Sequence, residues 1–253
     1  MTKVNVYGLD GSVKEKIDLP HVFHTPYRPD IISKNVNAIH SNKRQPYGCD
    51  PFAGTKHSVA SVGKGRGMSR VPRLAQGRVA ALAPCVVGGR RAHPPKVERN
   101  WHEKINKKEK KIARNSALAA TADKELVSKR GHKFDESVTL PIIVDDSFEN
   151  LKKTKDVIDV LQKIGIYDDV VRATNGKHIR AGRGKSRGRK YRIPRSILII
   201  SAKNDIVKSS ENLTGVELTD PVNLNVENLA PGGIAGRLTI MTQSALKQLG
   251  GAK

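Results

Sequence analysis

The stretch that decides the fold is SILIIS, Ser196–Ser201, in which four branched apolar residues stand between two serines. A continuous apolar run of this kind predicts a strand that is covered on both faces, since a half-exposed strand alternates apolar and polar residues. Downstream, RLTIMT at Arg237–Thr242 predicts a further strand, and Gln243–Leu249 predicts the helix that follows it. Covered strands of this type belong to sheets that carry helices on both sides.

Upstream of this run, strands and helices alternate. Val138–Val144 predicts a strand, in which Pro141 favours an edge position or the start of the strand. Phe148–Ile164 predicts a helix that Gly165 ends. One face of this helix is expected to carry Leu151, Thr154, Ile158 and Leu161.

A longer helix is predicted before these elements. Asn106 followed by Glu109 is typical of a capped helix start, and Lys129–Gly131 is typical of a helix end. The expected buried face between them consists of Ile112, Ala113, Ala117, Ala120 and Val127.

The amino-terminal part predicts two strands and a short helix. The strands, Val4–Tyr7 and Val13–Leu19, are joined by the turn signal Asp10-Gly11. Asp30 is expected to cap the helix, which places Ile32, Val36 and Ile39 on one face. The whole pattern predicts an α/β sandwich with a largely parallel sheet.

This pattern is interrupted between Lys43 and Arg99. The segment shows no sustained period of 2 or 3.6 residues, and its 8 Gly and 6 Pro make up about a quarter of it. It cannot bury enough apolar surface to offset its ordering entropy alone. We expect residues 43–99 to form an extended internal loop, with residues 1–42 and 100–253 forming the globular domain. We also expect the loop to become ordered on nucleic acid.

The positive charge is concentrated in two segments. Residues 43–99 contain 12 Lys or Arg against 2 Asp or Glu, and residues 172–195 contain 10 Lys or Arg and no acid. The formal net charge is +22, so the remaining 172 residues carry only +2. A nearly neutral body with two basic segments indicates a polyanion partner that binds at these segments.

The sequence gives little support for a nucleotide-binding, metal or catalytic site. GRGKS at Gly182–Ser186 resembles the end of a P-loop, but Ile179 stands where the motif needs glycine and no strand precedes it. Asp145-Asp146 is expected to end a strand and cap a helix rather than to bind a metal. For Cys49 and Cys85 buried thiols are expected, with a disulfide or a metal site as alternatives. No active site is specified, so we predict no enzyme, no cofactor and no metal site.

The amino terminus and the apolar runs bear on localisation. MTKVNVYGLDGS lacks the apolar core of a signal peptide, and the longest apolar runs are about five residues. We therefore expect a cytoplasmic protein with no membrane partner.

The basic segments suit folded RNA. Glycine lets the backbone approach a phosphate or base, and the guanidinium group of arginine forms bidentate hydrogen bonds with phosphate oxygens. Such irregular chains fit the grooves and junctions of RNA better than a regular duplex. Trp101 is expected to anchor the root of the loop in the core, with stacking on a base as the alternative. The candidate RNA-binding residues are Lys56, Lys64, Arg66, Arg70, Arg73, Arg78, Arg90, Arg91, Lys96, Arg99, Trp101, Lys177, Arg180, Arg183, Lys185, Arg187, Arg189, Lys190, Arg192 and Arg195.

Four segments carry a resemblance to a known family. They are GKGRGMSRVPR (Gly63–Arg73), the stretch Gly88–His132 that includes ERNWHEKINKKEKK, GRGKSRGRKYRIP (Gly182–Pro194) and NLAPGGIAGRLTIMTQSAL (Asn228–Leu246). In this order they resemble the ribosomal protein L4 family of the large subunit, nearly end to end. Eukaryotic members carry a long carboxy-terminal extension, so a chain that stops at Lys253 resembles the archaeal form. Ala75–Val87 aligns only loosely.

The resemblance implies a structural, rRNA-organising component of the large ribosomal subunit with a role in subunit assembly. It implies a three-layer α/β domain and a long internal loop that reaches the constriction of the polypeptide exit tunnel. Implied partners are large-subunit ribosomal RNA, neighbouring ribosomal proteins including a uL22-type protein at the tunnel, and the nascent peptide. The residues that match the tip of the loop are Gly63, Lys64, Gly65, Arg66, Gly67, Met68, Ser69 and Arg70.

Two alternatives remain open. An extra-ribosomal RNA-binding or regulatory protein would carry similar charge but would not need a neutral body enclosing one long loop. A nucleotide-dependent enzyme would need a Gly-rich loop directly after a strand, which the sequence lacks.

Overall fold

The computed structural model describes residues 3–203 and 206–251. The chain forms two compact units. We call the first, Met1–His40 with Lys104–Lys253, the body, and the second, Ser41–Glu103, the arm. Within the described ranges, no helix has the length and apolar content that a membrane crossing requires.

The body is built on one six-stranded sheet. Only β2 runs antiparallel to its neighbour; every other neighbouring pair is parallel. The mixed α/β fold and the largely parallel sheet predicted from the sequence are therefore confirmed. In spatial order the strands are β2 (Val13–Asp18), β1 (Lys3–Tyr7), β5 (Ile142–Val144), β10 (Thr239–Thr242), β8 (Leu198–Ile200) and β9 (Glu217–Thr219).

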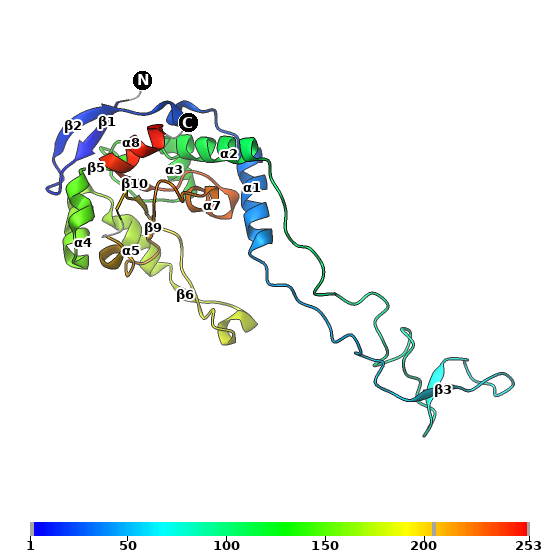
Figure 1. The fold of residues 1–253 in the computed structure, drawn as a ribbon. Coiled ribbons are helices and arrows are strands. Elements are labelled where there is room, and N and C mark those ends of the chain that lie inside the picture. Colours follow the sequence, from blue (N-terminus) through cyan, green and yellow to red (C-terminus); the bar gives the residue numbers. More distant parts are fainter. Residues whose placement is uncertain (1–2, 204–205, 252–253) are drawn as a thin grey trace. The chain divides into compact units, whose positions relative to one another are not determined.

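The apolar run Ser196–Ser201 contributes to a core on each face of the sheet. Leu198 and Ile200 point into one buried cluster, and Ile197 and Ile199 point into the other, because successive side chains of a strand alternate. The first cluster is covered by α1 (Pro29–Asn42), α2 (Lys107–Ala120), α7 (Val226–Leu229), α8 (Gln243–Gly251) and the turn η1 (His21–His24). The second lies under α4 (Thr154–Ile164) and α5 (Tyr167–Asn175), which Figure 1 labels. The short helix α6 (Val207–Ser210) contacts α4.

The single helix predicted from Asn106 to Arg130 is wrong, because the segment forms α2 and α3 (Lys124–Arg130). Asp123 separates the two helices, because its carboxylate caps α3 by accepting a hydrogen bond from the backbone N–H of Glu125. Asn106 occupies the N-cap position of α2 without a capping side-chain hydrogen bond. The expected buried face is correct except for Ile112, which is 44 % exposed.

The helix predicted from Phe148 begins only at Thr154. Phe148 is buried in a separate short turn, η2 (Asp146–Asn150), and Leu151 behind it is extended. The buried face therefore shifts to Val157, Val160, Leu161 and Ile164, and Ile158 is only half-buried.

Other predicted details differ as well. Pro141 directly precedes β5, an interior strand, so it marks a strand start and not an edge. Asp30 lies inside the first turn of α1 rather than capping it. Asp145 and Asp146 follow the end of β5 as expected, but Asp145, at the N-cap position of η2, makes no capping side-chain hydrogen bond and pairs with Lys14, and Asp146 accepts hydrogen bonds from Ser244. The helix α5, the strand β9 and the short helices α6, α7 and η4 (Pro231–Gly233) had no predicted counterpart.

The arm runs out and back along itself. The backbone N–H of Cys49 donates to the carbonyl of Pro95 at 3.1 Å, and a Cβ at Gly48 would collide with Val97, so the two stretches touch here. Two strands of three residues, β3 (Val59–Ser61) and β4 (Pro72–Leu74), pair in antiparallel register. Strands this short leave no period in the sequence, which explains why none was expected. Both cysteines lie in the arm, exposed and free, so the expectation of buried thiols is wrong.

Candidate nucleic-acid interface

The second basic segment is an exposed hairpin of the body. It consists of β6 (His178–Ile179), the turn η3 (Arg183–Ser186) and β7 (Tyr191–Arg192), and we call residues 177–192 the basic hairpin. Gly182 and Gly188 take positive φ values of 76° and 75°, which only glycine adopts readily. The eight basic side chains of the hairpin form no ion pair with any described residue; they are Lys177, Arg180, Arg183, Lys185, Arg187, Arg189, Lys190 and Arg192.

Both ends of the basic hairpin are fixed by one buried carboxylate. Asp169 accepts a hydrogen bond from Arg172 Nε before the hairpin (2.8 Å) and from Ser196 Oγ after it (2.8 Å). Arg172 Nη2 also donates to the carbonyl of Arg195 at 2.9 Å. The chain therefore enters and leaves the hairpin through a common polar network inside the body.

His132 completes this network as a neutral side chain. Its Nδ1 lies 2.9 Å from Asp169 Oδ2, and burial lowers the pKa of His132 despite the neighbouring carboxylate. Burial alone would raise the pKa of Asp169, but hydrogen bonds from His132 and Arg172 outweigh it and hold that pKa at about 2. Asp169 is thus an ionised acceptor.

Arg195 differs from the rest of its segment because it is paired. It forms an ion pair with Glu217, whose other oxygen lies 2.5 Å from Nη1 of the fully buried Arg237. Arg237 also donates to the carbonyls of Ser196 and Asn228, at 2.9 and 2.8 Å. Burial and the charge of Arg195 lower the pKa of Arg237 to about 9.

The tip of the arm carries exposed, unpaired charge on a glycine-rich backbone. Gly63, Gly65 and Gly67 all have positive φ values, from 67° to 79°, and a Cβ there would meet no neighbouring atom within 4 Å. Lys64, Arg66 and Arg70 between and beside them are exposed, as is Ser69, while Met68 is half-buried. Arg73 is held locally, donating to Ser69 Oγ (2.9 Å) and to the carbonyl of Arg78 (2.5 Å).

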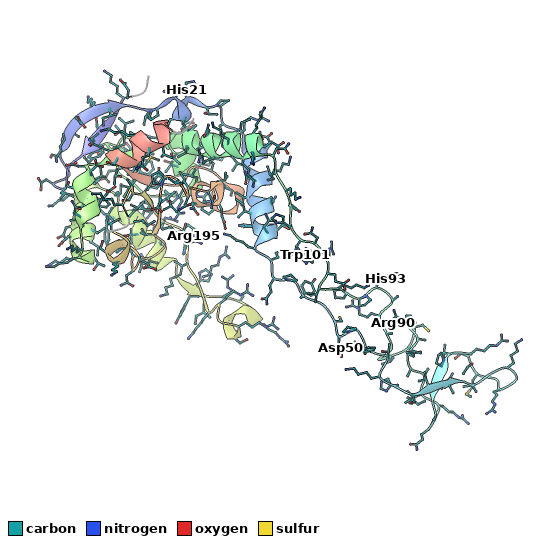
Figure 2. All side chains as sticks on the ribbon, viewed as in Figure 1. His21, Asp50, Arg90, His93, Trp101 and Arg195 are labelled. Atoms are coloured by element: carbon teal, nitrogen blue, oxygen red, sulfur yellow. The ribbon has the colours of Figure 1, made fainter. Side chains whose placement is uncertain are left out.

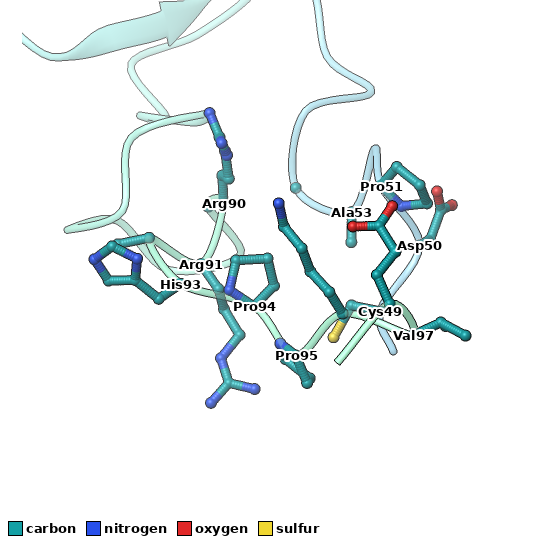
Figure 3. A pocket seen from close by; sticks show the side chains of 15 residues that line it. Cys49, Asp50, Pro51, Ala53, Arg90, Arg91, His93, Pro94, Pro95 and Val97 are labelled. Carbon is teal, nitrogen blue, oxygen red and sulfur yellow. The ribbon is translucent and has the colours of Figure 1, made fainter. Parts of the chain in front are cut away.

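The middle of the arm contains a cavity of about 680 Å³ between the outgoing and returning stretches. Figure 3 shows Arg90 and Arg91 pointing to opposite sides of it, with His93 directed away from Cys49 and Asp50. Lys96 also lines the cavity. Lys56 is paired with Asp50 at 2.5 Å, and the hydrogen bond from Lys56 lowers the pKa of Asp50.

The root of the arm gathers aromatic and basic side chains. Trp101 lies under the guanidinium groups of Arg44 and Arg99, whose Cζ atoms are 3.9 and 4.3 Å from its ring centroid. Tyr47 stacks near the same indole, with centroids 6.2 Å apart and 22° between the ring planes. Among the described residues, Trp101 (Figure 2) belongs to neither hydrophobic core cluster, so the expectation that it anchors the root of the loop in the core is wrong. Sequence reasoning missed Arg44 and Tyr47, although the pattern R-x-x-Y directly after α1 was available as a signal.

The predicted RNA-binding residues therefore lie in two groups, one on the arm and one in the body, where all of them except Arg195 belong to the basic hairpin. Apart from Lys56 and Arg195, their charged groups form no ion pair among the described residues. In the same parts of the chain, no group of three His, Cys, Asp or Glu is arranged to hold a metal ion. The arrangement offers exposed cations, donors and a few aromatic rings, which suits binding of a polyanion.

Comparison with known proteins agrees with this chemistry. The model of the family described as "Ribosomal protein L4/L1 family" matches residues 17–252. The large ribosomal subunit protein uL4 of Methanocaldococcus jannaschii is 53 % identical over 248 residues, covering 98 % of each chain. Those of Archaeoglobus fulgidus and Methanococcoides burtonii are 51 % and 50 % identical, covering 98 % and 99 % of each chain. The chain thus belongs to the ribosomal protein L4/L1 family.

Proposed function

We propose that this protein is a structural constituent of the large ribosomal subunit that binds and organises ribosomal RNA and has a role in subunit assembly. It is no enzyme, and it acts in the cytoplasm as part of the ribosome. The observation that carries the proposal is the set of exposed, unpaired cations on the arm and on the basic hairpin of a nearly neutral body. Its relatives, which are named large ribosomal subunit proteins, supply the context.

The two groups of cations have different roles in this proposal. The chain on both sides of the basic hairpin is hydrogen-bonded to Asp169, so the hairpin is held by the body. Its basic side chains bind rRNA and anchor the protein there. Within the arm, residues 43–99 are an extended internal loop that threads through rRNA. Its tip, Gly63–Arg70, reaches the constriction of the exit tunnel beside a uL22-type protein and the nascent peptide.

The positive φ values at Gly63, Gly65 and Gly67 support a tip that fits closely against other molecules. A glycine backbone approaches phosphates or a peptide without the obstruction of a Cβ. The exposed Lys64, Arg66 and Arg70 supply charge to the same segment.

The test compares the two groups in cells. One variant lacks residues 61–73, which removes Lys64, Arg66, Arg70 and Arg73. A second variant carries alanine in place of the seven basic residues from Arg180 to Arg192. A matched control replaces four exposed lysines of the body with alanine, at Lys152, Lys153, Lys155 and Lys163. The share of each protein in large subunits on a sucrose gradient, and read-through of a stalling peptide, are measured.

The expected results separate the roles. The tip deletion enters large subunits and changes passage of stalling peptides, whereas the hairpin variant is incorporated poorly and the lysine control behaves as the unmodified chain. Loss of incorporation on tip deletion, with normal incorporation of the hairpin variant, contradicts the assignment. Absence of the unmodified protein from large subunits contradicts the proposed function itself and favours an extra-ribosomal RNA-binding protein.

A further inference from the structure

The root of the arm holds two cations on one aromatic ring without a counter-charge. The Cζ atoms of Arg44 and Arg99 each lie about 4 Å from the Trp101 centroid, so they are at most about 8 Å apart. Neither guanidinium forms an ion pair with any described residue, and this includes the nearby Glu98 and Glu103. Two unpaired cations within about 8 Å of each other favour the binding of an anion beside them.

The backbone around this cluster is fixed by hydrogen bonds within the arm. Ser41 Oγ donates to the carbonyl of Trp101 at 2.6 Å. Asn42 Oδ1 accepts a hydrogen bond from the backbone N–H of Glu103 at 2.8 Å, and Asn100 Oδ1 accepts one from the backbone N–H of His102 at 2.9 Å. The indole is therefore held in position by its own backbone, and the two stretches of the arm are joined at this point.

The aromatic rings of Trp101 and Tyr47 differ in how accessible they are to a ligand. Trp101 is half-buried, and its indole Nε1 is buried with no hydrogen-bond partner among the described residues. Its ring is already in contact with two guanidinium groups. Tyr47 is 57 % exposed and lies beside this cluster, so it offers an aromatic surface next to the unpaired cations.

We infer that Arg44, Tyr47, Arg99 and Trp101 form a nucleotide clamp, an inference that rests on the proposed function. Its ligand is an unstacked nucleotide of single-stranded or bulged RNA. The base stacks on Tyr47, and the adjoining phosphate binds Arg44 and Arg99. Trp101 is a positioning residue that holds both guanidinium groups through cation–π contacts. A base within a regular duplex does not expose its face to Tyr47, so the clamp selects unpaired segments.

The first experiment uses the full chain with two probes, a single-stranded oligouridine RNA and the same strand in a duplex. Trp101 is the only tryptophan, so its fluorescence reports directly on the clamp. We expect the single strand to change the emission of Trp101 more than the duplex does. The variant Tyr47→Ala should lose roughly tenfold in affinity for the single strand, and Tyr47→Phe, which retains the ring, should restore it. Tyr27→Ala, at an exposed tyrosine of the body, serves as the matched control.

A second experiment identifies the contact. Single-stranded RNA that carries 5-iodouridine is irradiated with the full chain, and the modified residues are mapped by mass spectrometry. Nucleotide adducts on Tyr47 support the clamp. Adducts confined to Trp101, or an unchanged affinity of Tyr47→Ala, overturn it. Crosslinks from Tyr47 to a protein rather than RNA in isolated large subunits overturn it as well.

The clamp and the proposed function are contradicted by different results. If the unmodified chain binds full-length large-subunit rRNA and Tyr47→Ala binds it equally well, the clamp is wrong and the proposed function stands. If the unmodified chain does not bind that rRNA, the proposed function fails and the clamp fails with it.

Discussion

The body and the arm use arginine in opposite ways. Arg237 of the body is fully buried, and its donors reach Glu217 and the carbonyls of Ser196 and Asn228. Arg66 of the arm is exposed and forms no ion pair among the described residues. A buried charge needs its partners inside the fold, whereas an unpaired exposed charge keeps its donors for a ligand. We therefore expect the state of pairing, more than the residue type, to separate a structural arginine from an RNA-binding one.

The largest effect expected from this contrast is the salt dependence of RNA binding. If the unpaired cations neutralise 6 to 10 phosphates, the affinity for rRNA should fall roughly 10³- to 10⁵-fold between about 50 and 200 mM salt. Filter binding at several salt concentrations gives the slope. The hairpin variant should flatten the slope, and the Lys152, Lys153, Lys155 and Lys163 control should leave it nearly unchanged. A slope that is insensitive to the hairpin variant would contradict the assignment of charge to binding.

The second prediction concerns the buried arginine. Arg237→Met should lower the free energy of unfolding by about 3–5 kcal/mol, because Glu217 and several buried carbonyls lose their donor. Denaturation by urea, followed by circular dichroism, measures the change. Arg66→Met, the matched variant in the arm, should leave stability within about 0.5 kcal/mol of the unmodified chain. Equal losses in the two variants would mean that the arm supports the fold as Arg237 does.

The sequence predicted those elements that are determined by the residues within them. The run Ile197–Ile200 alone implies a strand covered on both faces, and β8 is such a strand. The sequence did not predict the break at Asp123, because the capping signal was expected at Asn106, whereas the carboxylate that caps a helix is Asp123, three residues past the end of α2.

The partners of charged side chains could not be read from the sequence. Arg195 and Arg192 belong to the same basic stretch, yet only Arg195 meets a carboxylate, and that carboxylate, Glu217, lies on a strand that had no predicted counterpart. Tyr47 next to Trp101 is likewise a contact between residues far apart in the chain. Composition locates the basic segments, but only the fold distinguishes the paired from the unpaired members.

The third prediction compares the resistance of the two units to trypsin. The arm has few buried side chains and two strands of only three residues, so it should open at little cost in free energy. Limited digestion of the free protein should cut first between Lys56 and Arg91, at least about tenfold faster than within α4. Mass spectrometry of early fragments identifies the sites. Binding to rRNA should protect the arm, and equal protection of arm and α4 in the free protein would contradict a difference in stability.

The last and smallest effect is a dependence of body stability on pH that comes from His132. Burial lowers the pKa of His132 below its ordinary value of 6.5, so the unfolded chain binds a proton there before the folded chain does. The stabilisation is therefore fully present above about pH 6.5 and is lost as the pH falls below it. Asp169, with a pKa of about 2 in the folded protein against 3.8, adds a further loss only below about pH 4.

Urea denaturation between pH 8 and pH 5 tests this sign directly. The unmodified chain should become less stable across the interval, and His132→Gln, which cannot gain the proton, should lose part of that slope. His102→Gln, at an exposed histidine of the arm, should leave the slope as it was. If stability instead rises toward pH 5, His132 is protonated inside the fold. Asp169 would then hold the ends of the basic hairpin through a charged pair, and the neutral network described for the body would be wrong.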